Sequence, residues 1–147
     1  MPIKPFYNEA LTGHHLHPAH KRDLPEANLT LRGVSPGCGD QITLHLRVSV
    51  AGIIEEGPCT GDGCAVSQAS ADMMLDLIIG ADRDRALHLC SLFMEMARGP
   101  VPESELAELG EAGALKDISR IPSRVRCATL GWRTLQALFR PAQAARA

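Results

Sequence analysis

Residues 37–50 have the sequence GCGDQITLHLRVSV, in which a glycine-rich loop leads directly into alternating apolar and polar residues. Over residues 42–50, every second side chain is apolar, which is the pattern of a half-buried β-strand. A shorter alternating stretch at 29–32 precedes it, and Ala51-Gly52 is a typical hairpin turn into a third strand. The sequence therefore predicts β-structure over residues 27–57.

The following residues change to helical spacing. Apolar side chains form single stripes over three predicted helices, at 63–79, 82–98 and 122–139. Asp62 is the predicted N-cap of the first of these helices, because a carboxylate there can accept free backbone N–H groups. Cys90 falls on the apolar stripe of the second helix, so we expect it to be a core residue.

Two further segments have weaker patterns. An early helix is predicted near 6–15, and the acidic, glycine-punctuated residues 100–118 predict a short helix followed by a mobile, solvated connection. The chain has 147 residues, which suits one domain. We expect that domain to cover 1–147, with loose ends at about 1–4 and 141–147.

Composition and charge narrow the class of protein. The chain has 15 basic and 17 acidic residues, and this balance argues against a nucleic-acid-binding protein. Its apolar runs are far shorter than the roughly 18 residues that span a bilayer, and its first residues have no signal-peptide core. We therefore expect a cytoplasmic protein without nucleic-acid or membrane partners, in a compartment where thiols stay reduced.

The cysteines are the main candidates for chemistry. Their number is odd, and in a reducing compartment this does not predict a disulfide framework. Metal binding or thiol chemistry is the leading interpretation, with core packing as the alternative for each residue. The five residues are Cys38, Cys59, Cys64, Cys90 and Cys127.

Three of these cysteines lie where a thiolate is favoured. Cys38 is flanked by glycines and lies two residues before Asp40, Cys64 is expected in the first turn of a helix, and Cys127 directly follows Arg126. Together with the carboxylate, these thiols would complete a tetrahedral zinc site. The long separations between them match no closed zinc-finger pattern, so spacing alone leaves metal binding open.

A second group of possible ligands lies near the start of the chain. It contains four histidines, and no single secondary-structure spacing brings them to one face. A solvated terminus is therefore the favoured interpretation, with metal binding as the alternative. The residues are His14, His15, His17 and His20.

Three motifs together identify a family. They are GCGDQ at 37–41, GDGCAVSQASA at 61–71 and RVRCATLGW at 124–132. In this order they closely resemble the U-type iron–sulfur cluster assembly proteins, the NifU N-terminal and IscU-like family, over about residues 5–140. The SufU branch is the better match, because IscU scaffolds carry a histidine directly before the last cysteine, where this chain has Arg126.

The resemblance implies a fold, a metal and a reaction. The implied fold is α+β, with a small antiparallel three-stranded sheet packed by helices, in agreement with the patterns above. The implied zinc ligands are Cys38, Asp40, Cys64 and Cys127. The implied activity is that of a zinc-dependent sulfurtransferase, in which Cys38 accepts persulfide sulfur from a PLP-dependent cysteine desulfurase of the SufS type. Downstream iron–sulfur assembly proteins are further expected partners.

Several alternatives stay open at this point. An IscU-type scaffold would use the same residues to hold iron or an iron–sulfur cluster. A purely structural zinc site is disfavoured by the carboxylate, and a zinc hydrolase by the lack of an evident general base. Arg126 would either stabilise thiolate charge or contact the partner. Cys59 occupies a position where the family usually has another residue, and we interpret it as incidental instead of as a reserve thiol.

Overall fold

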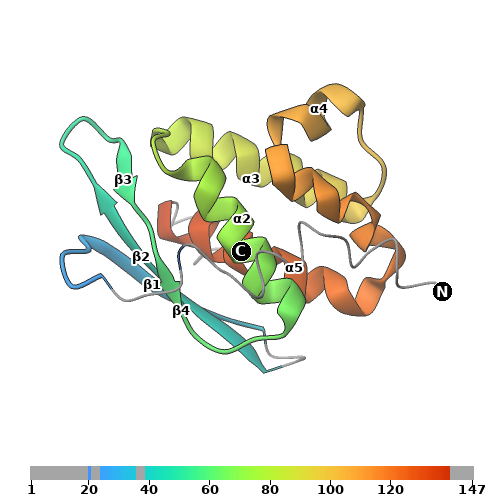
Figure 1. Cartoon of the computed structure of the whole chain (residues 1–147), viewed down its shortest axis with the longest axis horizontal. Coiled ribbons are helices and arrows are strands. Elements are labelled where there is room, and N and C mark those ends of the chain that lie inside the picture. Colours follow the sequence, from blue (N-terminus) through green and yellow to red (C-terminus); the bar gives the residue numbers. More distant parts are fainter. Residues whose placement is uncertain (1–19, 21–23, 36–38, 140–147) are drawn as a thin grey trace.

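The computed structural model describes residues 20, 24–35 and 39–139 (Figure 1). Several sequence predictions fall outside this part of the chain. They concern the helix near 6–15, His14, His15, His17, Cys38 and the chain ends at 1–4 and 141–147.

The sheet is antiparallel and has β2 (Asp40–Val48) at its centre. β1 (Leu29–Ser35) pairs with β2 along one edge. β3 (Ile54–Glu56) and the two-residue β4 (Cys59–Thr60) pair with other parts of β2. This arrangement confirms the predicted α+β fold with a small antiparallel sheet, and it adds one short strand to the three that the sequence indicated.

The alternation along β2 buries fewer residues than its pattern predicted. Ile42, Leu44 and Leu46 are buried in the core. Val48 is only partly buried and Val50 is fully exposed, because the chain turns away from the sheet directly after β2. The period-two pattern therefore continues past the end of the strand that it predicts.

The three long helices are confirmed. They are α2 (Ala65–Ile78), α3 (Arg83–Arg98) and α5 (Pro122–Phe139). The predicted cap of α2 is wrong, since the N-cap residue is Cys64 and not Asp62. Within the described residues, no helix is long and apolar enough to cross a membrane.

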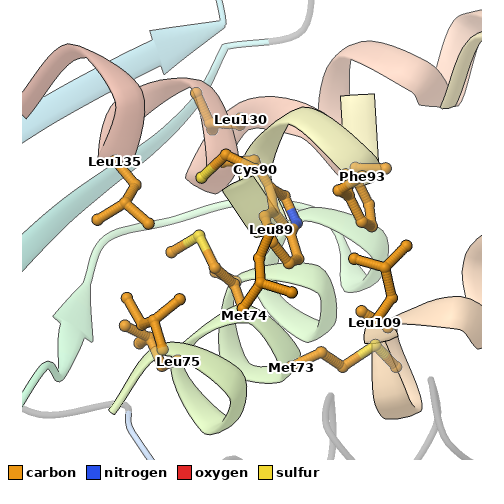
Figure 2. Close-up of a cluster of buried hydrophobic side chains, with 14 of the residues drawn as sticks. Met73, Met74, Leu75, Leu89, Cys90, Phe93, Leu109, Leu130 and Leu135 are labelled. Carbon is orange, nitrogen blue, oxygen red and sulfur yellow. The ribbon is translucent and has the colours of Figure 1, made fainter. Parts of the chain in front are cut away.

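The helices pack as a layer against the sheet, and α5 connects the two layers (Figure 1). This helix contacts β1 and β2 as well as α2 and α3. Gly33 permits its close approach to β1, because a side chain there would collide with Thr134. Figure 2 shows the core between the helices, where Cys90 lies among leucine, methionine and phenylalanine side chains. The prediction that Cys90 is a core residue is thus confirmed.

The segment between α3 and α5 corrects the prediction of a solvated connection. It forms the short helix α4 (Glu103–Glu108), as expected, and then the 3₁₀-helical segment η1 (Gly110–Arg120). Four apolar residues of this region have no exposed surface, and they recur every third position, which is the period of a 3₁₀ helix. They are Leu109, Ala112, Leu115 and Ile118.

A candidate metal centre

Three separate elements bring three potential metal ligands together. Asp40 is the first residue of β2, Cys64 is the N-cap of α2, and Cys127 lies in the second turn of α5. One ligand atom from each side chain lies within 4.8 Å of the other two. Asp40 and Cys127 are 8% and 2% exposed, and Cys64 is intermediate, so the group is sheltered and Cys64 is its most accessible member.

Asp40 is placed by the turn that precedes β2. Gly39 has a φ of +74°, a left-handed conformation that favours glycine, and its N–H donates to the carbonyl of Ser35 at 2.9 Å. Ser35 and Asp40 are then paired across β1 and β2. The carboxylate therefore starts a strand whose register with β1 is set by the pairing of Ser35 with Asp40.

Cys64 is placed by two glycines in the loop before α2. Gly61 has a φ of +132°, and a side chain there would collide with the backbone of Gln41. A side chain at Gly63 would collide with Ser67 and would come within 3.4 Å of the Asp40 carboxyl carbon. These glycines allow the start of α2 to lie directly against the start of β2.

Hydrogen bonds determine the charge state of the carboxyl group in the cluster. Partial burial raises the pKa of Asp40, but hydrogen bonds from the Cys64 backbone and from the side chains of Cys64, Ser67 and Cys127 outweigh burial and lower it below its usual value. The backbone contact joins the Cys64 N–H to Asp40 Oδ2 at 3.4 Å. Asp40 is therefore ionised at neutral pH, as a metal ligand must be.

Sequence reasoning did not single out Ser67. Its hydroxyl donates to the carbonyl of Cys64 at 3.1 Å and also contacts the Asp40 carboxylate. The signal was available, because a serine three residues after an N-cap lies on the same first turn of the helix. The prediction of Asp62 as the N-cap placed the start of the helix too early, so it did not indicate this relation between Cys64 and Ser67.

The other predicted site residues have different outcomes. Cys38 lies outside the described residues, although it is only two positions before Asp40 in the chain. Arg126 is exposed beside Cys127. Cys59 is buried in β4, and its N–H donates to the carbonyl of His20 at 2.7 Å.

His20 is the described member of the histidine group, and it contacts α2. Its N–H donates to Asp72 Oδ1 at 2.9 Å, and its Nε2 lies 2.7 Å from Asp76 Oδ1. These contacts attach His20 to two carboxylates of a helix. His20 is therefore held against α2, which corrects for this residue the expectation of a solvated terminus.

The donor set fits a zinc ion. Zinc binds thiolate sulfur at about 2.3 Å and carboxylate oxygen at about 2.0–2.2 Å, so the ligand atoms of a tetrahedral ion lie roughly 3.5–3.8 Å apart. The three observed ligand atoms all lie within 4.8 Å of one another, so they would move closer together to hold one ion. Two thiols and a carboxylate leave one tetrahedral position, which a further cysteine can fill.

The fold and this site define a class: a small α+β protein with a thiol–carboxylate centre between a sheet and two helices. The chain belongs to the NifU-like N-terminal domain family, whose model matches residues 6–136. This membership confirms the resemblance to U-type iron–sulfur assembly proteins that the three sequence motifs indicated.

Relatives of two kinds are found. The zinc-dependent sulfurtransferase SufU of Bacillus subtilis is 33% identical over 130 residues, which cover 88% of this chain and 86% of that protein. The iron–sulfur cluster assembly scaffold protein IscU of Streptococcus pyogenes is 39% identical over 111 residues, covering 75% and 69%. A crystal structure from Fervidobacterium islandicum, described as a putative scaffold protein for the SUF system, has a TM-score of 0.84 at 28% identity, covering 91% of this chain and 96% of that one.

Proposed function

We propose that this protein is a zinc-dependent sulfurtransferase that accepts persulfide sulfur from a SufS-type cysteine desulfurase for iron–sulfur cluster assembly. The observation that carries the proposal is the grouping of Asp40, Cys64 and Cys127 within 4.8 Å. The name of the Bacillus subtilis relative supports the same activity. The proposed site of action is the cytoplasm, where thiols stay reduced.

Cys38 completes the proposed ligand set and is the proposed sulfur acceptor. It lies two residues before Asp40, so their Cα atoms are at most about 7 Å apart. That distance is short enough for both side chains to reach one ion. The sequence neighbours of Cys38 are glycines, which have no side chains that could cover a thiol.

The transfer step is a thiol–disulfide type of exchange. When bound, zinc would keep the cysteine thiols of the site deprotonated. The Cys38 thiolate attacks the outer sulfur of the desulfurase persulfide, and a new sulfur–sulfur bond forms at Cys38. The bond in the enzyme persulfide breaks, and the desulfurase cysteine leaves as a thiolate. One bond forms and one breaks between the same types of atoms, so no external oxidant or reductant is needed.

Other residues of this chain hold the site in place during the exchange. Asp40 is kept ionised and oriented by the N–H of Cys64, as described above. Arg126 is exposed next to Cys127, where its charge is available to a persulfide anion or to an acidic patch of the partner.

The decisive experiment replaces the acceptor. Cys38→Ser is expected to abolish the stimulation of a SufS-type desulfurase and the gain of one sulfur atom in the mass of the protein. Cys59→Ala is the matched control, since Cys59 is interpreted as incidental and should leave both measurements unchanged. Full stimulation by folded Cys38→Ser protein would end the assignment of Cys38 as acceptor.

A scaffold function is the second candidate, because the Streptococcus pyogenes relative carries that name. The same cysteines would then hold iron and sulfide. Anaerobic reconstitution with iron and sulfide separates the two functions. A stable visible chromophore, together with no stimulation of the desulfurase, would favour the scaffold.

A further inference from the structure

The relative position of α2 and α5 determines the distance between two of the candidate ligands. Cys64 is the N-cap of α2 and Cys127 lies near the start of α5. Both helices are stiff elements, so any shift of one along the other changes the distance between the two sulfur atoms. Contacts that fix the position of one helix on the other therefore also fix this distance.

The helices meet at a point with almost no free space. A side chain at Gly131 would lie only 3.2 Å from the Cβ of Ala71 and 3.4 Å from its Cα. Glycine on α5 and alanine on α2 thus allow the two backbones to approach closely. Apolar contact alone, however, permits helices to slide, since it has no preferred direction.

Directional contacts are supplied by one buried hydroxyl. Ser70 Oγ on α2 donates to the carbonyl of Ala128 on α5 at 2.6 Å, and it accepts from Trp132 Nε1 at 2.9 Å. None of these three residues has exposed surface. The Ser70 hydroxyl therefore makes two hydrogen bonds to α5, one as donor and one as acceptor. Because the site is buried, the loss of either hydrogen bond would be costly.

A third helix holds the indole in place. Phe93 of α3 stacks on Trp132, with ring centroids 4.2 Å apart and ring planes 7° from parallel. The stack fixes the direction of the Trp132 N–H toward Ser70. We call the contacts among Ser70, Ala128 and Trp132 the α2–α5 clamp. Within it, the indole is held by Ser70 of α2 and by Phe93 of α3.

We propose that Ser70 is a positioning residue for the metal centre, acting through the α2–α5 clamp. Ala128 directly follows Cys127 in the chain, so the hydrogen bond from Ser70 fixes the backbone next to that ligand. Ser70 lies on the same helix as Cys64, six residues further along. The clamp sets the separation of the two sulfur atoms and with it the affinity and the geometry of the bound metal. This inference rests on the metal site of the proposed function but not on sulfur transfer.

The test compares Ser70→Ala with a matched variant of α5. Thr134→Val removes another buried hydroxyl, one that donates at 2.8 Å to the Leu130 carbonyl within the same helix and does not reach α2. Zinc affinity is measured by chelator competition, and site geometry by the absorption spectrum of the cobalt-substituted protein. Ser70→Ala is expected to lower zinc affinity roughly tenfold and to change the cobalt spectrum, whereas Thr134→Val changes neither.

A milder variant guards against simple loss of folding. Trp132→Phe keeps an aromatic ring against Phe93 but removes the N–H that binds Ser70, so it should shift the cobalt spectrum in the same direction by less. If folded Ser70→Ala protein keeps the zinc affinity and the cobalt spectrum of the unaltered chain, the positioning role is wrong. An equal loss in Thr134→Val would also overturn it. If the unaltered chain itself binds no zinc, the proposed function fails as well, which is a distinct result.

Discussion

The N-termini of α2 and α3 differ in whether the N-cap side chain binds a backbone N–H group of the first turn. Asp82 caps α3, and its side chain accepts the N–H of Arg85 at 2.8 Å. Cys64 occupies the equivalent place on α2, in a similar extended conformation, but it makes no side-chain cap hydrogen bond. The first turn of α2 also lacks acidic residues, whereas that of α3 contains Asp84.

The N-cap residue of α3 stabilises its helix, whereas the N-cap residue of α2 is a candidate metal ligand. A capping side chain satisfies free N–H groups and adds stability. At α2 that position holds a thiol that faces Asp40 and Cys127 instead. Stability at this end is therefore exchanged for a candidate metal ligand.

The largest expected effect comes from removing the thiol at the uncapped end. Cys64→Ser should lower zinc affinity by about a hundredfold or more, because even changes next to a ligand cost about 10- to 100-fold. Chelator competition followed by elemental analysis measures the loss. Zinc bound as tightly by Cys64→Ser as by the unaltered protein would remove Cys64 from the ligand set.

The next effect concerns a cysteine outside the site. Cys90→Ala should lower the free energy of unfolding by about 1–1.5 kcal/mol, because it leaves a small cavity in the core shown in Figure 2. Urea denaturation measures this loss. Zinc binding and sulfur transfer should be unchanged, and a folded variant that no longer transfers sulfur would contradict the role of Cys90 as a core residue.

A smaller effect tests the two helix ends directly. Asp82→Ala should destabilise the metal-free protein by about 1 kcal/mol, because a side-chain cap is lost. Cys64→Ser in the same metal-free state should have the opposite sign and add up to about 1 kcal/mol, since serine is a preferred N-cap. Denaturation in the presence of a chelator gives both values. A destabilised Cys64→Ser protein would show that α2 cannot use a cap.

The smallest effect is expected on the surface between α3 and α4. Hydrogen bonds from Arg85 and His88 lower the pKa of Glu108 below 4.5 and outweigh a small opposing effect of burial. A carboxyl group whose pKa is lower in the folded protein stabilises the fold at pH values above its pKa in the unfolded chain. This stabilisation is lost as the pH falls through the pKa in the folded protein. Glu108→Gln should therefore reduce the thermal midpoint slightly at neutral pH and not at all well below pH 4.5. Equal losses at both pH values would rule out the charge as the cause.

Regular patterns in the sequence predicted most of the fold. Spacing of apolar residues gave β1, β2 and the long helices, because burial of one face selects the period of each element. It did not predict η1. The acidic residues of this segment favoured a solvated connection, although its apolar residues follow a three-residue spacing that ends at Ile118. It also misplaced the cap of α2, because Asp62 has the better capping side chain, but the bond that its carbonyl accepts from the Gln41 N–H ties it to β2.

The amino-acid sequence by itself determined the types of the longer elements, the buried position of Cys90 and, through three motifs, the family. Only the tertiary structure showed that Asp40, Cys64 and Cys127 converge, and that Ser67 contacts two of them. The reason is physical: periodicity records which face of an element is buried, whereas the distance between residues far apart in the chain depends on how those elements pack. Here that packing depends on glycines that let backbones touch and on one hydroxyl between two helices.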